Sequence, residues 1–136
     1  ETIYRSNPRR KTLWLDLGNK LHDGQVILGE LPSEALRFKC WRLPTVADLF
    51  PDVIDESKDT QDDTPSCSLA EALRKQSLFI NRGVSLYALN LLADLFRYGK
   101  LTYHGVFLNL ETGRTSPLAI DPNMWASFGY STDERQ

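Results

Sequence analysis

The chain has 136 residues, 41% of them hydrophobic and 10% aromatic, and its formal net charge is −2. A chain of this size can bury one core without disulfides or metal, so we expect a single domain over residues 1–136. It contains no run of the roughly 18 apolar residues needed to span a membrane. Its two cysteines also lack a zinc-like spacing. We therefore expect a cytoplasmic protein without metal, cofactor or membrane contact.

The first part, residues 1–51, is predicted to form a helix followed by a hairpin. Asn7 and Pro8 are typical of a helix start, and the Asp-Gly pair at 23–24 is typical of a helix end. The apolar residues between them are Leu13, Leu15 (or Trp14), Leu17 and Leu21. Strands are expected over 25–29 and 35–43, and Thr45 is expected to cap a short helical turn over 46–50 that Pro51 ends.

Residues 52–67 contain six acidic residues and one lysine, with almost no apolar side chain after Ile54. This composition predicts a flexible acidic loop. A calcium-binding loop needs a central glycine and a distal glutamate at fixed spacing, and this stretch has no glycine.

The second part, residues 68–136, is predicted to form two helices and a hairpin. Ser68 and Glu71 form a capping-box pattern, which predicts a helix over 69–80 before a tight turn at 81–84. Leucines at helical spacing predict a second helix over 86–98 that is buried on most sides. Ser85 is its expected N-cap and Gly99 its expected C-cap.

Strand-forming residues follow over 100–121, with turn chemistry at 111–114, so a hairpin is expected there. The segment after Pro122 is expected to pack back as a short helical turn.

These elements predict an α+β fold in which helices pack on short antiparallel hairpins. An internal duplication is a further hypothesis, with two repeated helix-hairpin units. Placing Gly24 on Gly99 aligns Leu17 with Leu92 and Val26 with Leu101.

No catalytic or nucleotide-binding motif occurs at a diagnostic spacing. His22 and His104 could act as bases only beside partners that the sequence does not identify. The glycines are spaced as turn residues rather than as a phosphate cradle. We therefore assign no catalytic, cofactor or metal residue, and an enzyme whose site is assembled from distant residues remains an alternative.

The order helix 69–80, turn, helix 86–98 and hairpin 100–121 looks like a helix-turn-helix with a wing, which would bind DNA. Against this, the supposed recognition helix has only one cation, Arg97, and also exposes Asp94. The candidate nucleic-acid contacts are Arg9, Arg10, Lys11, Lys100, His104 and Arg114.

The preferred interpretation is a non-catalytic binding or regulatory module that acts through protein-protein contacts, with a protein partner or a second copy. Three tryptophans, five tyrosines and six phenylalanines are more than one small core needs, so we expect some on the surface. The candidate interaction residues are Trp41, Phe107, Trp125 and Tyr130.

Overall fold

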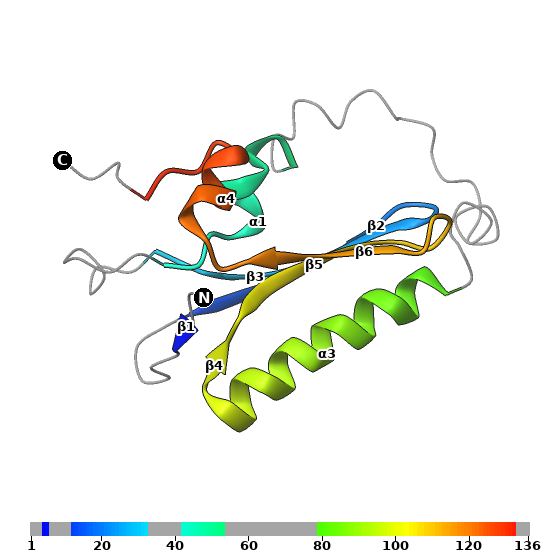
Figure 1. Cartoon of the computed structure of the whole chain (residues 1–136), viewed down its shortest axis with the longest axis horizontal. Coiled ribbons are helices and arrows are strands. Elements are labelled where there is room, and N and C mark those ends of the chain that lie inside the picture. The colour runs from blue at the N-terminus through cyan, green and yellow to red at the C-terminus, as the bar shows by residue number, and fades with distance from the viewer. Residues whose placement is uncertain (1–3, 6–11, 33–41, 54–78, 133–136) are drawn as a thin grey trace.

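The computed structural model describes residues 4–5, 12–32, 42–53 and 79–132, and within them the fold is mixed α+β. A four-stranded antiparallel sheet in the order β2-β3-β5-β6 forms its centre (Figure 1). The sheet strands are β2 (Leu13–Asn19), β3 (Asp23–Glu30), β5 (Tyr103–Asn109) and β6 (Arg114–Ala119), and β1 (Tyr4–Arg5) pairs separately with β4 (Lys100–Leu101). Because β3 pairs with β5, strands from the two predicted units belong to one sheet.

The helix predicted over the first leucines is wrong, because these residues form the edge strand β2. Leu13, Leu15 and Leu17 alternate along the strand, which is the period of two that places side chains on one sheet face. The expected strand over 25–29 is confirmed as β3. The predicted strand over 35–43 lies largely outside the described residues. The duplication hypothesis therefore lacks the helix of its first unit.

The longest helix, α3 (Ile80–Tyr98), is one continuous element of 19 residues. Residues 81–84 form its first turn, so the predicted tight turn there and the predicted N-cap at Ser85 are wrong. The rest of the helix expected over 69–80 lies outside the described residues. The predicted end is confirmed, since Gly99 adopts a left-handed conformation with φ of 64°.

Glycine occurs inside α3 because the helix lies close to the sheet at that point. A Cβ on Gly83 would lie 3.0 Å from a methyl carbon of Leu108 on β5. On the strand side, a Cβ on Gly24 would lie 2.5 Å from a methyl carbon of Val84. Both positions therefore favour glycine through close packing rather than through a turn.

One face of α3 packs on the sheet and the opposite face is exposed. Ile80, Val84, Ala88, Leu91 and Leu95 recur every three or four residues and are buried in the core. The prediction of burial on most sides is wrong, because several leucines and aromatic residues of the helix point into solvent.

The cap, which we define as α1 (Val46–Leu49) and α4 (Pro122–Ser127), lies on the other side of the sheet from α3 (Figure 1). Thr45 caps α1 as predicted, and a 3₁₀ turn, η2 (Pro51–Val53), follows it. The expected short helix after residue 121 is confirmed as α4, with Asp121 as its N-cap.

The predicted hairpin over 100–121 is confirmed as β5 and β6, and Gly113 in its turn has φ of 70°. Its regular pairing is interrupted by a β-bulge between Tyr103 and Gly105, which leaves His104 as an extra residue on β5.

Candidate functional site

The candidate nucleic-acid contacts do not form one surface among the described residues. Lys100 is exposed in β4, just before β5 begins. Arg114 is exposed at the start of β6, at the far end of β5, so the length of that strand separates the two cations. His104 is fully buried. Arg9, Arg10 and Lys11 lie outside the described residues. With the turn at 81–84 absent as well, the described residues do not confirm a winged-helix arrangement.

His104 joins the sheet to the cap. Its Nδ1–H donates to the Leu28 carbonyl oxygen at 2.8 Å, and its Nε2 accepts the indole N–H of Trp125 at 2.9 Å. These two bonds require the neutral tautomer with the proton on Nδ1. Burial lowers the pKa of His104 to about 4, although the bond to the Leu28 carbonyl opposes this shift. Its role is therefore structural, and it is not available as a surface base or a DNA contact.

The four aromatic residues chosen from the sequence do not form one exposed patch. Trp125 belongs to α4 and is fully buried, which excludes it from a surface. Tyr130 is half-buried against Trp125, and its ring lies under the Arg42 guanidinium. Phe107 is half-buried on the sheet, and Trp41 lies outside the described residues.

A second polar network holds the segment before α1. Arg42 donates two hydrogen bonds to the Asp48 carboxylate, at 2.6 and 2.7 Å, and a third to the Glu30 carbonyl oxygen. The bond with Asp48 raises the pKa of Arg42. Burial opposes ionisation of Asp48, but the bonds from Arg42 and Thr45 outweigh it and lower the pKa of Asp48. The Arg42 and Asp48 side chains are therefore bonded to each other within the fold, and their role is structural.

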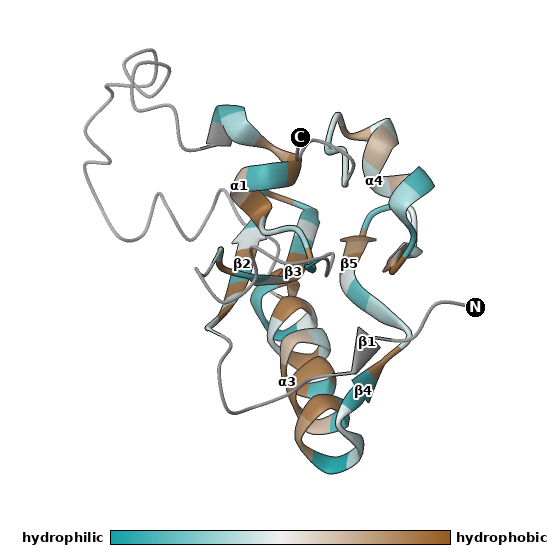
Figure 2. Ribbon diagram, turned by 90° about the vertical axis from the view of Figure 1, so that its left-hand side faces the viewer, coloured by the Kyte–Doolittle hydropathy of each residue, from teal (hydrophilic) through white to brown (hydrophobic). Residues whose placement is uncertain are grey.

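The outer face of α3 exposes the surface that the sequence analysis missed. Leu86 is 67% exposed, Leu89 is 65% and Phe96 is 80%. Ala93 is also exposed. Along the helix, Leu86, Leu89, Ala93 and Phe96 follow one another at steps of three, four and three residues, and we call these four residues the outer stripe. Figure 2 shows hydrophobic segments recurring along α3. The spacing was visible in the sequence, but it could not be distinguished there from a core-facing pattern.

Two cations lie beside the outer stripe. Arg82 precedes Leu86 by one turn, and Arg97 follows Phe96. Both are exposed, and neither forms an ion pair with a carboxylate in the described part of the chain. Arg97 lies 5.6 Å from the ring centre of Tyr98. The nearby Asp94 accepts a hydrogen bond from Asn90. The surface is thus apolar along its centre and cationic at both ends.

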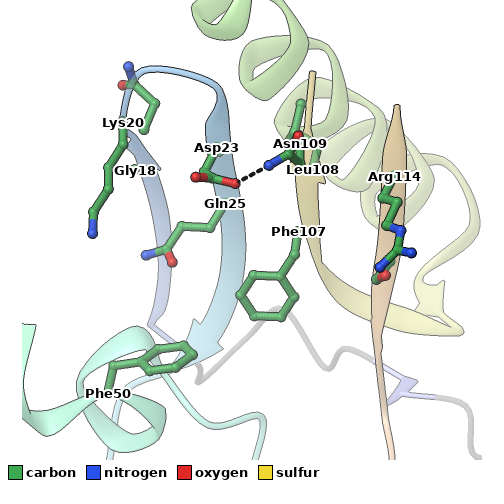
Figure 3. Close-up of a pocket in the computed structure, with 12 residues that line it drawn as sticks. Gly18, Lys20, Asp23, Gln25, Phe50, Phe107, Leu108, Asn109 and Arg114 are labelled. Carbon is green, nitrogen blue, oxygen red and sulfur yellow. Dashed lines mark hydrogen bonds between the residues drawn. The ribbon is translucent and has the colours of Figure 1, made fainter. Parts of the chain in front are cut away.

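A pocket of about 660 Å³ opens on the part of the sheet that the cap leaves uncovered (Figure 3). Phe50 and Phe107 form its apolar wall, and its polar lining includes Gln25, Asn109, Arg114 and Ser116. Asp23 accepts a hydrogen bond from Asn109 at 2.6 Å across the β3–β5 pair. Of the residues predicted from the sequence, this pocket contains Phe107 and Arg114. We call it the sheet pocket.

Comparisons with protein-family models, curated proteins and solved structures found no match to this chain. Among the described residues, no group of three or more histidine, cysteine or acidic side chains could hold a metal ion. None of the described helices combines the length and apolarity that crossing a membrane requires.

Proposed function

We propose that this chain is a non-catalytic binding module whose outer stripe on α3 docks an amphipathic helix of a partner protein with acidic flanking residues. The observation that carries the proposal is the exposure of Leu86, Leu89 and Phe96 along one line of the helix. Isolated exposed leucines are ordinary, but a contiguous apolar line bordered by polar residues is typical of an interaction surface.

The spacing of the stripe favours a helical partner. Steps of three, four and three residues follow the a and d positions of a heptad, the pattern by which two helices pack side chains into each other. Arg82 occupies the preceding d position and Phe79, 57% exposed, the preceding a position. The line therefore extends over most of α3 and suits a partner helix of about four turns.

The charges favour an acidic partner over a second copy. An antiparallel pair of copies centred between Leu89 and Ala93 would bring Arg82 to the end of α3 in the other copy, where Lys100 follows the C-cap Gly99. A parallel pair would bring each arginine near its own equivalent. Like charges face each other in both arrangements, which costs free energy and selects against the pairing. Carboxylates on a partner helix would instead complement Arg82 and Arg97.

The test is selection from a displayed library of helices with leucine fixed only at the positions that meet the outer stripe and random residues elsewhere. We expect enrichment of glutamate and aspartate at the positions that meet Arg82 and Arg97. For an enriched peptide, Leu89→Asp should weaken binding by about tenfold or more, measured by fluorescence anisotropy. Leu110→Asp is the matched control, since Leu110 is 40% exposed in the β5–β6 turn and should leave binding unchanged.

Four outcomes would overturn the proposal, and the last of them is protection of the stripe by the chain itself. The first is the absence of any enriched helix, and the second is equal loss of binding in the Leu89 and Leu110 variants. The third is a concentration-dependent dimer that Leu89→Asp abolishes, which would identify the occupant as a second copy. Protection of a cysteine placed at Ala93 from a thiol reagent in the isolated monomer would show that another part of the same chain covers the stripe.

A further inference from the structure

The sheet pocket is independent of the outer stripe, because it lies on the opposite side of the sheet from α3. Gln25 on β3 is directly opposite Phe107 on β5, and Phe107 is directly opposite Ser116 on β6. Arg114 is directly opposite Asn109. Figure 3 shows side chains of β3, β5 and β6 side by side across this face, with Lys20 at the turn between β2 and β3. We propose that the sheet pocket binds a nucleoside monophosphate, with the base on Phe107 and the phosphate at Arg114.

The aromatic wall is held in one orientation before any ligand binds. Phe107 stacks on Phe128 with an angle of 28° between rings whose centres are 6.2 Å apart. Phe50 meets Phe107 edge-on, at 88° and 6.2 Å. Phe50 and Phe107 are half-buried and line the pocket. A fixed, partly exposed phenylalanine on a sheet is a stacking platform for a planar base.

Hydrogen-bonding groups lie on the β2–β3 side of this platform. The Gln25 amide N–H donates to Asp16 at 3.4 Å, which leaves its carbonyl oxygen to accept from a ligand. Asp23 uses one carboxylate oxygen for Asn109 and leaves the second. The amide nitrogen of Asn19 in the pocket wall is buried and has no hydrogen-bond partner. These groups can pair with the edge of a base, which carries both donors and acceptors, whereas a purely apolar ring would leave them unsatisfied.

An unpaired cation lies on the opposite side of the platform. The Arg114 guanidinium has no carboxylate partner within the described residues, and Ser116 supplies a hydroxyl beside it. Arginine binds phosphate oxygens through two parallel N–H bonds. Arg114 is paired with Asn109, so its Cα lies diagonally across the β5–β6 pair from that of Phe107, at roughly 8 Å. A ribose together with the flexible arginine side chain can span such a distance. A pocket of about 660 Å³ also suits a ligand of this size.

The experiment uses calorimetric titration of the full chain with adenosine monophosphate, uridine monophosphate, the two nucleosides and ribose 5-phosphate. We expect saturable binding of a monophosphate, with the nucleoside and the sugar phosphate each weaker by about tenfold or more. Arg114→Gln should reduce the affinity for the monophosphate to that for its nucleoside and leave nucleoside binding unchanged. Arg114 is exposed, and its side chain forms no hydrogen bond or ion pair within the described residues, so the substitution should leave folding intact.

Lys100→Gln is the matched control, because Lys100 is an exposed cation outside the sheet pocket. It should leave all affinities unchanged. Equal effects of Arg114→Gln and Lys100→Gln would overturn the proposal, as would the absence of saturable binding at millimolar ligand. An aromatic carboxylate that binds as well as the monophosphate would replace the nucleotide assignment. A short oligonucleotide that binds much more tightly than either monophosphate would show that the site binds a nucleic-acid strand.

Discussion

The cap and the outer stripe both carry large apolar side chains, but those of the stripe are exposed whereas Trp125 of the cap is buried. In the cap, Trp125 is buried and hydrogen-bonded to His104, and Arg42 is bonded to Asp48. On the outer stripe, Leu89 and Phe96 meet no covering element in the described residues. Apolar content alone therefore does not separate a covered surface from an open one. In this chain, the covered surface is distinguished by the hydrogen-bonded polar pairs beneath it.

The largest expected effect is loss of the cap through Trp125→Ala. The substitution removes a fully buried ring and the donor to His104, so the free energy of unfolding should fall by about 3–5 kcal/mol. Urea unfolding measures this change. Met124→Ala is the control, because Met124 is the exposed neighbour on the same short helix and should change stability by about 0.5 kcal/mol or less. A similar effect of both substitutions would contradict the buried role of Trp125.

Acid should weaken the cap next, through His104. Its pKa is about 4 in the folded protein and about 6.5 in an unfolded chain, so the unfolded state binds more protons between these values. This contribution to stability is fully present above about pH 6.5 and declines as the pH falls towards 4, by roughly 3 kcal/mol in all. Urea unfolding across this range measures the decline. His104→Leu should flatten the dependence, and an unchanged slope in that variant would assign it to other groups.

A smaller effect is expected from Asp48→Asn. Neutralising this carboxylate removes the partner of the partly buried Arg42 guanidinium and should lower the free energy of unfolding by about 1.5–3 kcal/mol. Thermal unfolding at pH 7 measures the difference. Glu111→Gln provides a matched control in the exposed hairpin turn, where no change is expected. If Asp48→Asn is equally silent, the network does not hold the cap.

The smallest effect on stability is expected on the outer stripe. Leu89→Ala should change the free energy of unfolding by about 0.5 kcal/mol or less, because the side chain is already 65% exposed. Leu91→Ala, two residues along the same helix and fully buried, should cost about 2–5 kcal/mol. Urea unfolding of the two variants measures both changes in the free energy of unfolding. A large cost at Leu89 would mean that the stripe is already covered in the folded chain.

Local chemistry made several elements predictable. Gly99 ends α3 because a left-handed residue is favourable without a Cβ, and Thr45 starts α1 by capping it. The hairpin over 100–121 follows from its strand-forming residues and the turn glycine. Leu13, Leu15 and Leu17 show the limit of such reasoning. Their spacing of two favours a strand. The helix prediction was wrong because it gave more weight to the helix start and stop signals on either side than to this spacing.

The candidate sites depend on contacts between distant residues and were less predictable. Residues 81–84 contain a glycine that is typical of a turn, but Gly83 lies within α3, close to Leu108 of the sheet. Leu89 and Leu91 are the same residue type on one helix, and only the position of the sheet decides which is buried. The sheet pocket joins Gln25 to Phe107 through the β3–β5 pairing, which no local pattern indicated.

The bulge at His104 changes the phase of β5. In a regular strand, residues 103 and 107 would point to the same face, because side chains alternate with a period of two. Here Tyr103 accepts a hydrogen bond from Asn90 on α3, whereas Phe107 contacts Phe50 on the opposite side of the sheet. The one extra residue therefore lets a single strand contribute an aromatic ring to each layer. Deleting this residue would turn the side chains at one end of β5 to the opposite face of the sheet. We therefore expect β5 to tolerate substitutions far better than insertions or deletions.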